Sequence, residues 1–200
     1  MTEIPPLIQR PIQLLRQEVR QCTLCSEVLT NGVRPVIQVG SSAKILIAGQ
    51  APGSKVHASG IPFDDASGDR LRSWMGVDKQ TFYDPEQIAI LPMGFCYPGK
   101  GKSGDLPPLT ICAKTWRTKL LATMPEIQLT LLIGRYALDW HLPDNNKNLT
   151  ETVKAWADYS DKLLALPHPS PRNNIWLKKN DWFEEDVLPI LKTRVRSALL

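Results

Sequence analysis

Four short apolar runs, each of four or five residues, limit what this chain can fold into. Runs of that length, bounded by glycine or proline, are typical of buried strands. Longer stretches with apolar residues at helical spacing lie between and around them. Strands that alternate with helices indicate an α/β domain with a mainly parallel sheet. The predicted strands are 44–48, 88–91, 129–133 and 163–166, and the predicted helices are 8–21, 68–75, 112–124, 149–159 and 183–200.

The overall composition is that of a single soluble domain spanning residues 1–200. No stretch approaches the roughly 20 apolar residues of a membrane span, and residues 1–20 lack the apolar core of a signal peptide. We therefore expect a cytoplasmic, monomeric protein without a membrane partner. Its four cysteines should be reduced thiols, metal ligands or cluster ligands. The net charge of +4 and the pI of about 8.9 permit a polyanionic partner.

Two loops follow the first and the last predicted strand, at residues 49–53 and 168–173. Because ligands bind at the carboxyl ends of parallel strands, we expect both loops to lie at the same edge of the sheet. The prolines in the second loop restrict its backbone, so it can present a preorganised His168. Glycines in the first loop permit close approach to a ligand, and Gln50 can donate and accept hydrogen bonds. Phe63, a little further on, can stack on a flat ring.

The residues of these loops resemble the motifs of a known family. Residues 49–53 read Gly-Gln-Ala-Pro-Gly and residues 60–63 read Gly-Ile-Pro-Phe. They are similar to the Gly-Glu-Ala-Pro-Gly and Gly-x-Pro-Phe of the iron–sulfur uracil-DNA glycosylases. Residues 168–173 read His-Pro-Ser-Pro-Arg-Asn, which resembles the superfamily's His-Pro-Ser motif and is closest to that of the single-strand-selective glycosylases. The similarity runs from about Cys22 to the C-terminus.

This resemblance implies a three-layer domain in which a central four-stranded, mainly parallel sheet lies between helices. It also implies an enzyme that flips a damaged base, by default uracil, out of DNA and hydrolyses its N-glycosidic bond. His168 would stabilise the negative charge on the leaving base, and such a donor is worth about 3–4 kcal/mol. Phe63 would stack on the base. The implied base-binding groups of the first loop are Gly49, Gln50 and Ala51, and Arg172 would enter the DNA as a wedge.

Further candidates come from side chains near these loops. Asp65 resembles an aspartate of a second thermostable glycosylase family and can orient water, although an aspartate here can equally cap the helix that starts near Gly68. His57 is a second candidate for the base pocket. Gln50 is a candidate catalytic and base-reading group. Phosphates could be held by Ser170, Arg172, Asn173, Lys100 and Lys102.

The four cysteines fall into two pairs, and together they suggest one four-thiolate site. A Cys-x-x-Cys pair places two sulfurs on a single turn, near enough to share one metal or cluster. Both spacings also resemble those of the iron–sulfur glycosylases, which implies a structural [4Fe–4S] cluster. Zinc suits four thiolates equally well, and four independent buried thiols remain a third interpretation. The candidate ligands are Cys22, Cys25, Cys96 and Cys112.

Two differences from the family pattern bear on the substrate. Pro92 stands where the iron–sulfur enzymes carry an asparagine that reads the pyrimidine, and proline has no side-chain donor or acceptor. Ala51 stands where the most active uracil enzymes carry a water-activating aspartate. Hypoxanthine, xanthine or an oxidised pyrimidine therefore remain open as substrates. So do a glycosylase-fold protein that binds damaged or single-stranded DNA without cutting it, and a metal-bound protein that acts on free nucleobases.

Overall fold

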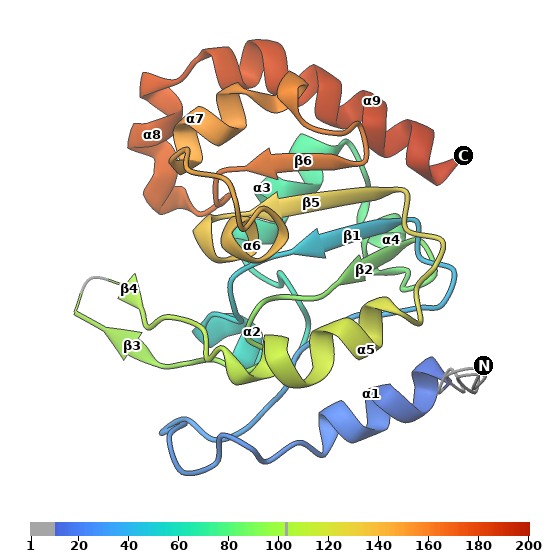
Figure 1. Ribbon diagram of the computed structural model, residues 1–200. Helices are drawn as coiled ribbons and strands as arrows, with labels where there is room; N and C mark the ends of the chain where they lie inside the picture. Colours follow the sequence, from blue (N-terminus) through green and yellow to red (C-terminus); the bar gives the residue numbers. More distant parts are fainter. Residues whose placement is uncertain (1–10, 103) are drawn as a thin grey trace.

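A four-stranded parallel sheet lies at the centre of the computed structural model, which describes residues 11–102 and 104–200 (Figure 1). Its strands are β1 (Ile45–Ala48), β2 (Ile88–Ile90), β5 (Leu129–Ile133) and β6 (Leu163–Leu166), in the order β2-β1-β5-β6. In the register, Ile47 stands opposite Ile90 on one side and Leu131 on the other. All four predicted strands form, and the prediction of an α/β domain with a parallel sheet is confirmed.

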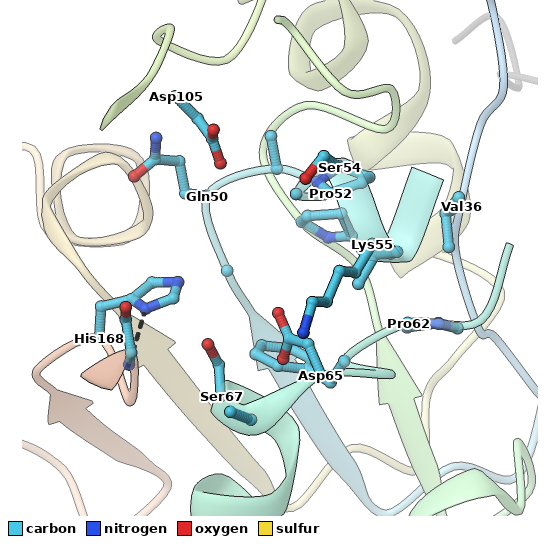
Figure 2. A pocket seen from close by; sticks show the side chains of 18 of the residues that line it. Val36, Gln50, Pro52, Ser54, Lys55, Pro62, Asp65, Ser67, Asp105 and His168 are labelled. Atoms are coloured by element: carbon cyan, nitrogen blue, oxygen red, sulfur yellow. Dashed lines mark hydrogen bonds between the residues drawn. The ribbon is translucent and has the colours of Figure 1, made fainter. Parts of the chain in front are cut away.

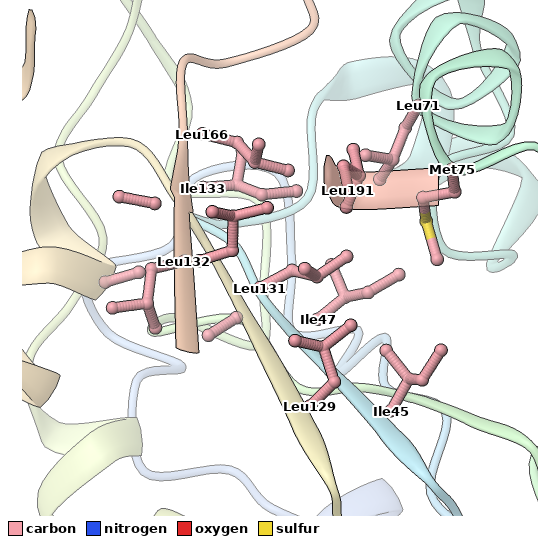
Figure 3. Packing of buried hydrophobic residues seen from close by; sticks show 14 of the residues in the cluster. Ile45, Ile47, Leu71, Met75, Leu129, Leu131, Leu132, Ile133, Leu166 and Leu191 are labelled. Atoms are coloured by element: carbon pink, nitrogen blue, oxygen red, sulfur yellow. The ribbon is translucent and has the colours of Figure 1, made fainter. Parts of the chain in front are cut away.

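The strands are apolar throughout because both faces of the sheet are covered. Ile45 and Ile47 pack into one buried cluster with Leu71, Met75 and Leu191 (Figure 3). Leu46 points to the opposite face and belongs to a second buried cluster. Successive side chains of β1 from Ile45 to Ile47 thus fill two separate cores, as the two-residue period of a strand requires.

Helices form the two outer layers. On the face of Ile47 lie α3 (Ala66–Met75) and α9 (Leu188–Leu199), which contact each other. On the face of Leu46 lie α1 (Ile12–Arg20) and α5 (Thr118–Leu121). The predicted first helix therefore forms over residues 12–20, and its predicted start at residues 8–10 lies outside the described residues.

The other predicted helices form with internal changes of geometry. The segment 112–124 begins as a π-helix, Ala113–Arg117, before α5. The segment 149–159 divides into α7 (Leu149–Lys154) and a 3₁₀ turn, Trp156–Asp158. The last segment begins as a π-helix, Phe183–Val187, and continues as α9. Pro189 is accommodated because it lies in the first turn of α9, where a missing N–H costs nothing.

The remaining elements are short, and the sequence did not predict them as helices or strands. A stretch of two to seven residues offers too few positions for a periodic pattern to emerge. They are α2 (Ser54–Ser59), α4 (Lys79–Tyr83), α6 (Arg135–His141), the 3₁₀ turn Pro171–Asn173, α8 (Asn174–Lys179), and the hairpin of β3 (Lys100–Gly101) and β4 (Gly104–Asp105). Within the described ranges, no helix is both long and apolar enough to span a membrane.

The carboxyl ends of the strands lie at one edge, and backbone hydrogen bonds join the loops there. Met93 N–H donates to the Gly49 carbonyl and Gly94 N–H to the Gln50 carbonyl, both at 2.9 Å. These bonds fix the loop after β1 against the loop after β2. The loop after β6 begins at the same edge, so segments far apart in the sequence share one site.

Candidate active site

A pocket of about 550 Å³ opens at this edge of the sheet (Figure 2). Its walls come from the loops after β1, β2 and β6, from the start of α3 and from the β3–β4 hairpin. Nine of the predicted site residues line it, namely Gly49, Gln50, Ala51, Phe63, Asp65, His168, Ser170, Arg172 and Asn173. The two loops that the sequence placed at one edge do meet in one cavity.

His168 is held as a neutral imidazole by its own loop. The Ser170 amide N–H donates to His168 Nδ1 at 3.2 Å, so Nδ1 carries no proton and Nε2 carries it. Burial lowers the pKa of His168, while the charges of Asp65 and Asp105 oppose that shift. The lowered pKa and the bond to Nδ1 favour the same state. The side chain therefore offers one N–H donor, as stabilisation of an anion requires.

Several hydrogen bonds fix the backbone that carries His168. Asn173 Nδ2 donates to the His168 carbonyl oxygen at 2.7 Å. Ser170 Oγ accepts the Arg172 amide N–H at 3.3 Å. From α3, Arg70 Nη1 donates to the Ser170 carbonyl at 3.2 Å and Nη2 to Asn174 Oδ1 at 2.8 Å. Arg70 was not among the predicted site residues, because nothing in the sequence relates α3 to this loop.

Phe63 has a backbone conformation that is uncommon for a bulky residue, with a φ of 54°. Its carbonyl oxygen accepts a hydrogen bond from the Tyr83 hydroxyl at 3.3 Å. A Cβ on Gly68 would lie 1.8 Å from that oxygen, so only glycine fits at this point of α3. The Phe63 ring meets Phe82 edge-to-face, with centroids 6.2 Å apart, and forms part of the pocket wall. Such local strain is typical of functional sites.

The first loop presents backbone groups as well as a side chain. Among the described residues, no backbone carbonyl accepts the amide hydrogens of Gln50 or Ala51, although the Gln50 carbonyl is used by Gly94. Both residues line the pocket. Figure 2 shows the Gln50 side chain beside Asp105, on the far side of the pocket from Asp65.

Asp65 both caps a helix and lines the pocket. Its Oδ1 accepts the Gly68 amide N–H at 3.0 Å as the N-cap of α3. Figure 2 shows Lys55, which was not predicted as a site residue, extending towards Asp65 across the pocket. The capping interpretation of Asp65 is therefore correct, and its position also keeps it within reach of a ligand.

Three of the residues predicted for base binding or DNA contact do not line the pocket. The structure corrects the prediction for His57, whose Nε2 lies 3.0 Å from the Asn31 carbonyl oxygen and whose ring packs near Tyr97. The helix α2 turns His57 away because Lys55, two residues earlier, takes the position facing the pocket. Lys100 and Lys102 are exposed on the β3–β4 hairpin, outside the cavity.

Asp105 lines the pocket although the sequence did not indicate it. It ends the β3–β4 hairpin, which folds over the first loop, so that Asp105 Oδ2 lies 3.7 Å from where a Cβ on Gly53 would be. Burial raises the pKa of Tyr97, and the charge of Asp105 and a hydrogen bond between the two side chains raise it further. No local pattern marks Asp105, because its place depends on how the hairpin folds back.

Pro92, the position that lacks the base-reading asparagine, also lines the pocket and is held from behind by a buried arginine. Arg117 Nη1 donates to the Leu91 carbonyl at 2.6 Å and lies 3.4 Å from the Pro92 carbonyl. Its Nη2 donates to His141 Nε2 at 2.8 Å. Burial lowers the pKa of Arg117 to about 10, and burial with the nearby Arg117 charge lowers that of His141 to about 4.

The four cysteines are free thiols that influence one another. Burial, with smaller contributions from the three other thiols, raises the pKa of Cys96 to about 11 against a backbone hydrogen bond from Arg34. Burial, Cys25 and Cys22 likewise raise the pKa of Cys112. Among the described residues, no three histidine, cysteine or acidic side chains are grouped closely enough to hold a metal ion. The set of four thiols nevertheless suits iron–sulfur or zinc chemistry.

Comparison with known proteins assigns the family. The family model of the uracil DNA glycosylase superfamily matches residues 37–192. The Type-4 uracil-DNA glycosylase of Saccharolobus solfataricus is 24% identical over 169 residues, which cover 80% of this chain and 76% of that protein. The enzyme of the same name from Sulfurisphaera tokodaii is 22% identical, covering 80% and 74%.

A solution NMR structure of a candidate uracil DNA glycosylase from Methanosarcina acetivorans is also similar. It is 15% identical, with a TM-score of 0.48, and the match covers 80% of this chain and 97% of that one. The family match spans both pocket loops and the whole parallel sheet. On that match, the chain belongs to the uracil DNA glycosylase superfamily.

Proposed function

We propose that this protein is a DNA glycosylase of base-excision repair, a monofunctional hydrolase that flips a deaminated base, uracil first, into the pocket and cleaves its N-glycosidic bond. The observation that carries the proposal is the pocket itself, in which a neutral histidine, an aromatic ring and free backbone amides converge. Those are the groups needed to bind a flat base and to stabilise it as an anion.

The residues divide the work as follows. Phe63 stacks on the flipped base, and the amides of Gln50 and Ala51 bind a carbonyl oxygen of the base, with Gly49 allowing its close approach. His168 donates from Nε2 to the base as negative charge develops there. Because Nδ1 is already bonded within the loop, the ring needs no reorientation during the reaction. The Gln50 side chain is available to read the edge of the base.

DNA would lie across the rim of the pocket. Arg172 lines the pocket and would enter the duplex, and Ser170 and Asn173 hold the turn that carries it. A Cβ on Gly104 would lie 3.0 Å from Arg172 Nη1, so the β3–β4 hairpin adjoins Arg172. The exposed lysines of that hairpin, Lys100 and Lys102, extend the basic surface. Phosphate contacts of this kind make binding weaken as salt rises.

We further infer that Cys22, Cys25, Cys96 and Cys112 hold one [4Fe–4S] cluster, with zinc as the alternative. The mutual influence of the four thiols supports a shared site. The thiols follow α1 and flank the loop that carries the hairpin, so the group would tie these segments together and have no part in hydrolysis. A visible absorption band in protein purified anaerobically would support the cluster. A colourless protein that contains zinc would show that zinc occupies the site instead.

The test of the proposed function is base release from oligonucleotides. Purified protein is incubated with single- and double-stranded DNA containing uracil, hypoxanthine, xanthine or oxidised pyrimidines, and the free base is measured. Release of uracil is expected. No release from any of these substrates would contradict the proposed activity.

A second candidate function is damage binding without cleavage. Pro92 and Ala51 support it, because both line the pocket and neither has a polar side chain. Tight binding to uracil-containing DNA without base release would favour this alternative. In either case we propose a cytoplasmic protein that acts as a monomeric, single-domain unit.

A further inference from the structure

Two acidic side chains are found among the described residues that line the pocket, and they are held in different ways. Asp65 accepts the Gly68 amide N–H as a helix cap, and Lys55 extends towards it (Figure 2). One carboxylate oxygen of Asp65 is thus already used by the fold as the N-cap of α3.

Asp105 lies in the β3–β4 hairpin, where its cross-strand neighbour is Lys100. Burial raises the pKa of Tyr97, and Asp105 lies close enough for its charge and a hydrogen bond to raise it further. Its Oδ2 lies 3.7 Å from where a Cβ on Gly53 would be, and the adjoining Gly104 lies against Arg172. The hairpin therefore connects the two catalytic loops and holds a carboxylate between them. Ala51, which also lines the pocket, has no side-chain acceptor that could bind the attacking water.

The charge of Asp105 is unexpected at this place if it has no chemical role. The surface around it carries Lys100 across the hairpin, Lys102 and Arg172, which suits DNA phosphates. An exposed acidic side chain in that surface repels phosphates and lowers affinity for DNA. A carboxylate that costs affinity for DNA but lines the pocket suits a hydrolytic site, which needs a base for the attacking water.

We propose that Asp105 is the catalytic residue that orients the attacking water and accepts its proton. The inference rests on the proposed glycosylase activity. The water oxygen bonds to C1′ of the deoxyribose as the C1′–N bond breaks. The electron pair of that bond leaves on the base, which His168 stabilises as an anion. One water proton passes to the Asp105 carboxylate, and the negative charge of Asp105 also stabilises the positive charge that develops on the sugar.

The test compares Asp105→Asn with wild type and with Asp64→Asn, which removes an exposed acidic side chain beside Asp65 that does not line the pocket. The readouts are the single-turnover rate constant of base release and the Kd for uracil-containing DNA. General-base catalysis contributes about 10²–10⁴-fold, so Asp105→Asn should slow release at least ~100-fold. Its Kd should stay the same or fall, because a negative charge is lost. Asp64→Asn should match wild type.

A purely structural or DNA-contacting role would weaken binding and rate together, and that result would overturn the proposal. So would a larger loss for Asp65→Asn than for Asp105→Asn. Thermal melting checks that Asp105→Asn folds. Asp105→Glu keeps the carboxylate, so it should recover part of the rate that Asp105→Asn loses. If wild type releases base and His168→Ala does not, while Asp105→Asn stays active, only the role of Asp105 fails. If wild type releases no base, the proposed function fails first.

Discussion

The loops after β6 and after β1 meet in one pocket but contribute different kinds of group. The loop after β6 contributes a side chain, His168, whose tautomer is fixed by a neighbouring backbone amide. The loop after β1 contributes its own amides, and the segment that continues from it through α2 contributes the Phe63 ring, which depends on a strained backbone held against Gly68. The chemistry of the loop after β6 depends on the proton of His168 Nε2. Binding by the loop after β1 depends on the conformation of the backbone.

This difference predicts that substitutions in the two loops affect different properties of the protein. Removing the functional group after β6 should reduce the rate of cleavage with little effect on folding. Disturbing the support of the loop after β1 should weaken base binding and lower stability, because the backbone itself forms the site. Rate and affinity measured together can therefore separate the two loops.

Among changes that compare the two loops, the largest effect is expected from His168→Ala. Loss of one preorganised donor to a developing anion costs about 10²–10³-fold in kcat. KM for uracil-containing DNA should change little, and single-turnover base release measures the effect. His57→Gln is the matched control, because His57 bonds outside the pocket and should retain near wild-type activity. A comparable loss in the control would place His57 in the reaction after all.

Gly68→Ala should have the next largest effect. The new Cβ would lie 1.8 Å from the Phe63 carbonyl oxygen, so the backbone of Phe63 must move. Base stacking on an aromatic ring is worth about 1–3 kcal/mol, so kcat/KM should fall about 10-fold or more, mainly through KM. The melting temperature should fall as well. Ser73→Ala, at an exposed position of the same helix, is the control and should leave both values unchanged.

Asn173→Ala should cause a smaller loss that resembles a weak His168 variant. It removes the 2.7 Å hydrogen bond to the His168 carbonyl, worth about 1 kcal/mol, so kcat should fall about 5-fold while KM holds. Asn180→Ala removes a similar side-chain bond, to the Trp176 carbonyl at 2.8 Å, at the other end of α8. It should not change kcat. An increase in KM for Asn173→Ala would show that Asn173 acts on DNA rather than on His168.

The smallest expected effect is the response to pH around neutrality. His168 works as a neutral donor, and burial holds its pKa below the ordinary value of 6.5, so protonation removes the active form only below that pH. The single-turnover rate should therefore be flat from about pH 7 to pH 9 and should fall on the acid side. A rate that is already half lost at or above pH 6.5 would mean that the imidazolium is not excluded.

Much of the frame could be predicted from local patterns. Four apolar runs gave the four strands, because a strand buried on both faces is continuously apolar. The rule that ligands bind at the carboxyl ends of parallel strands brought residues 49–53 and 168–173 to one edge. Short elements such as α2 and the β3–β4 hairpin were not predicted, because they are too short to show a periodic pattern of apolar residues.

Composition and motif could name His168, which follows a strand in a proline-containing loop, and Phe63, which follows Gly60 and Pro62. Composition and motif could not predict the tautomer of His168, the orientation of His57 away from the pocket, or the position of Asp105 in the pocket wall. These depend on contacts between segments distant in the chain, which form only when loops close and helices pack. A buried strand is determined by the apolar side chains of its own sequence, whereas the lining of the pocket is determined by contacts between segments that are distant in the sequence.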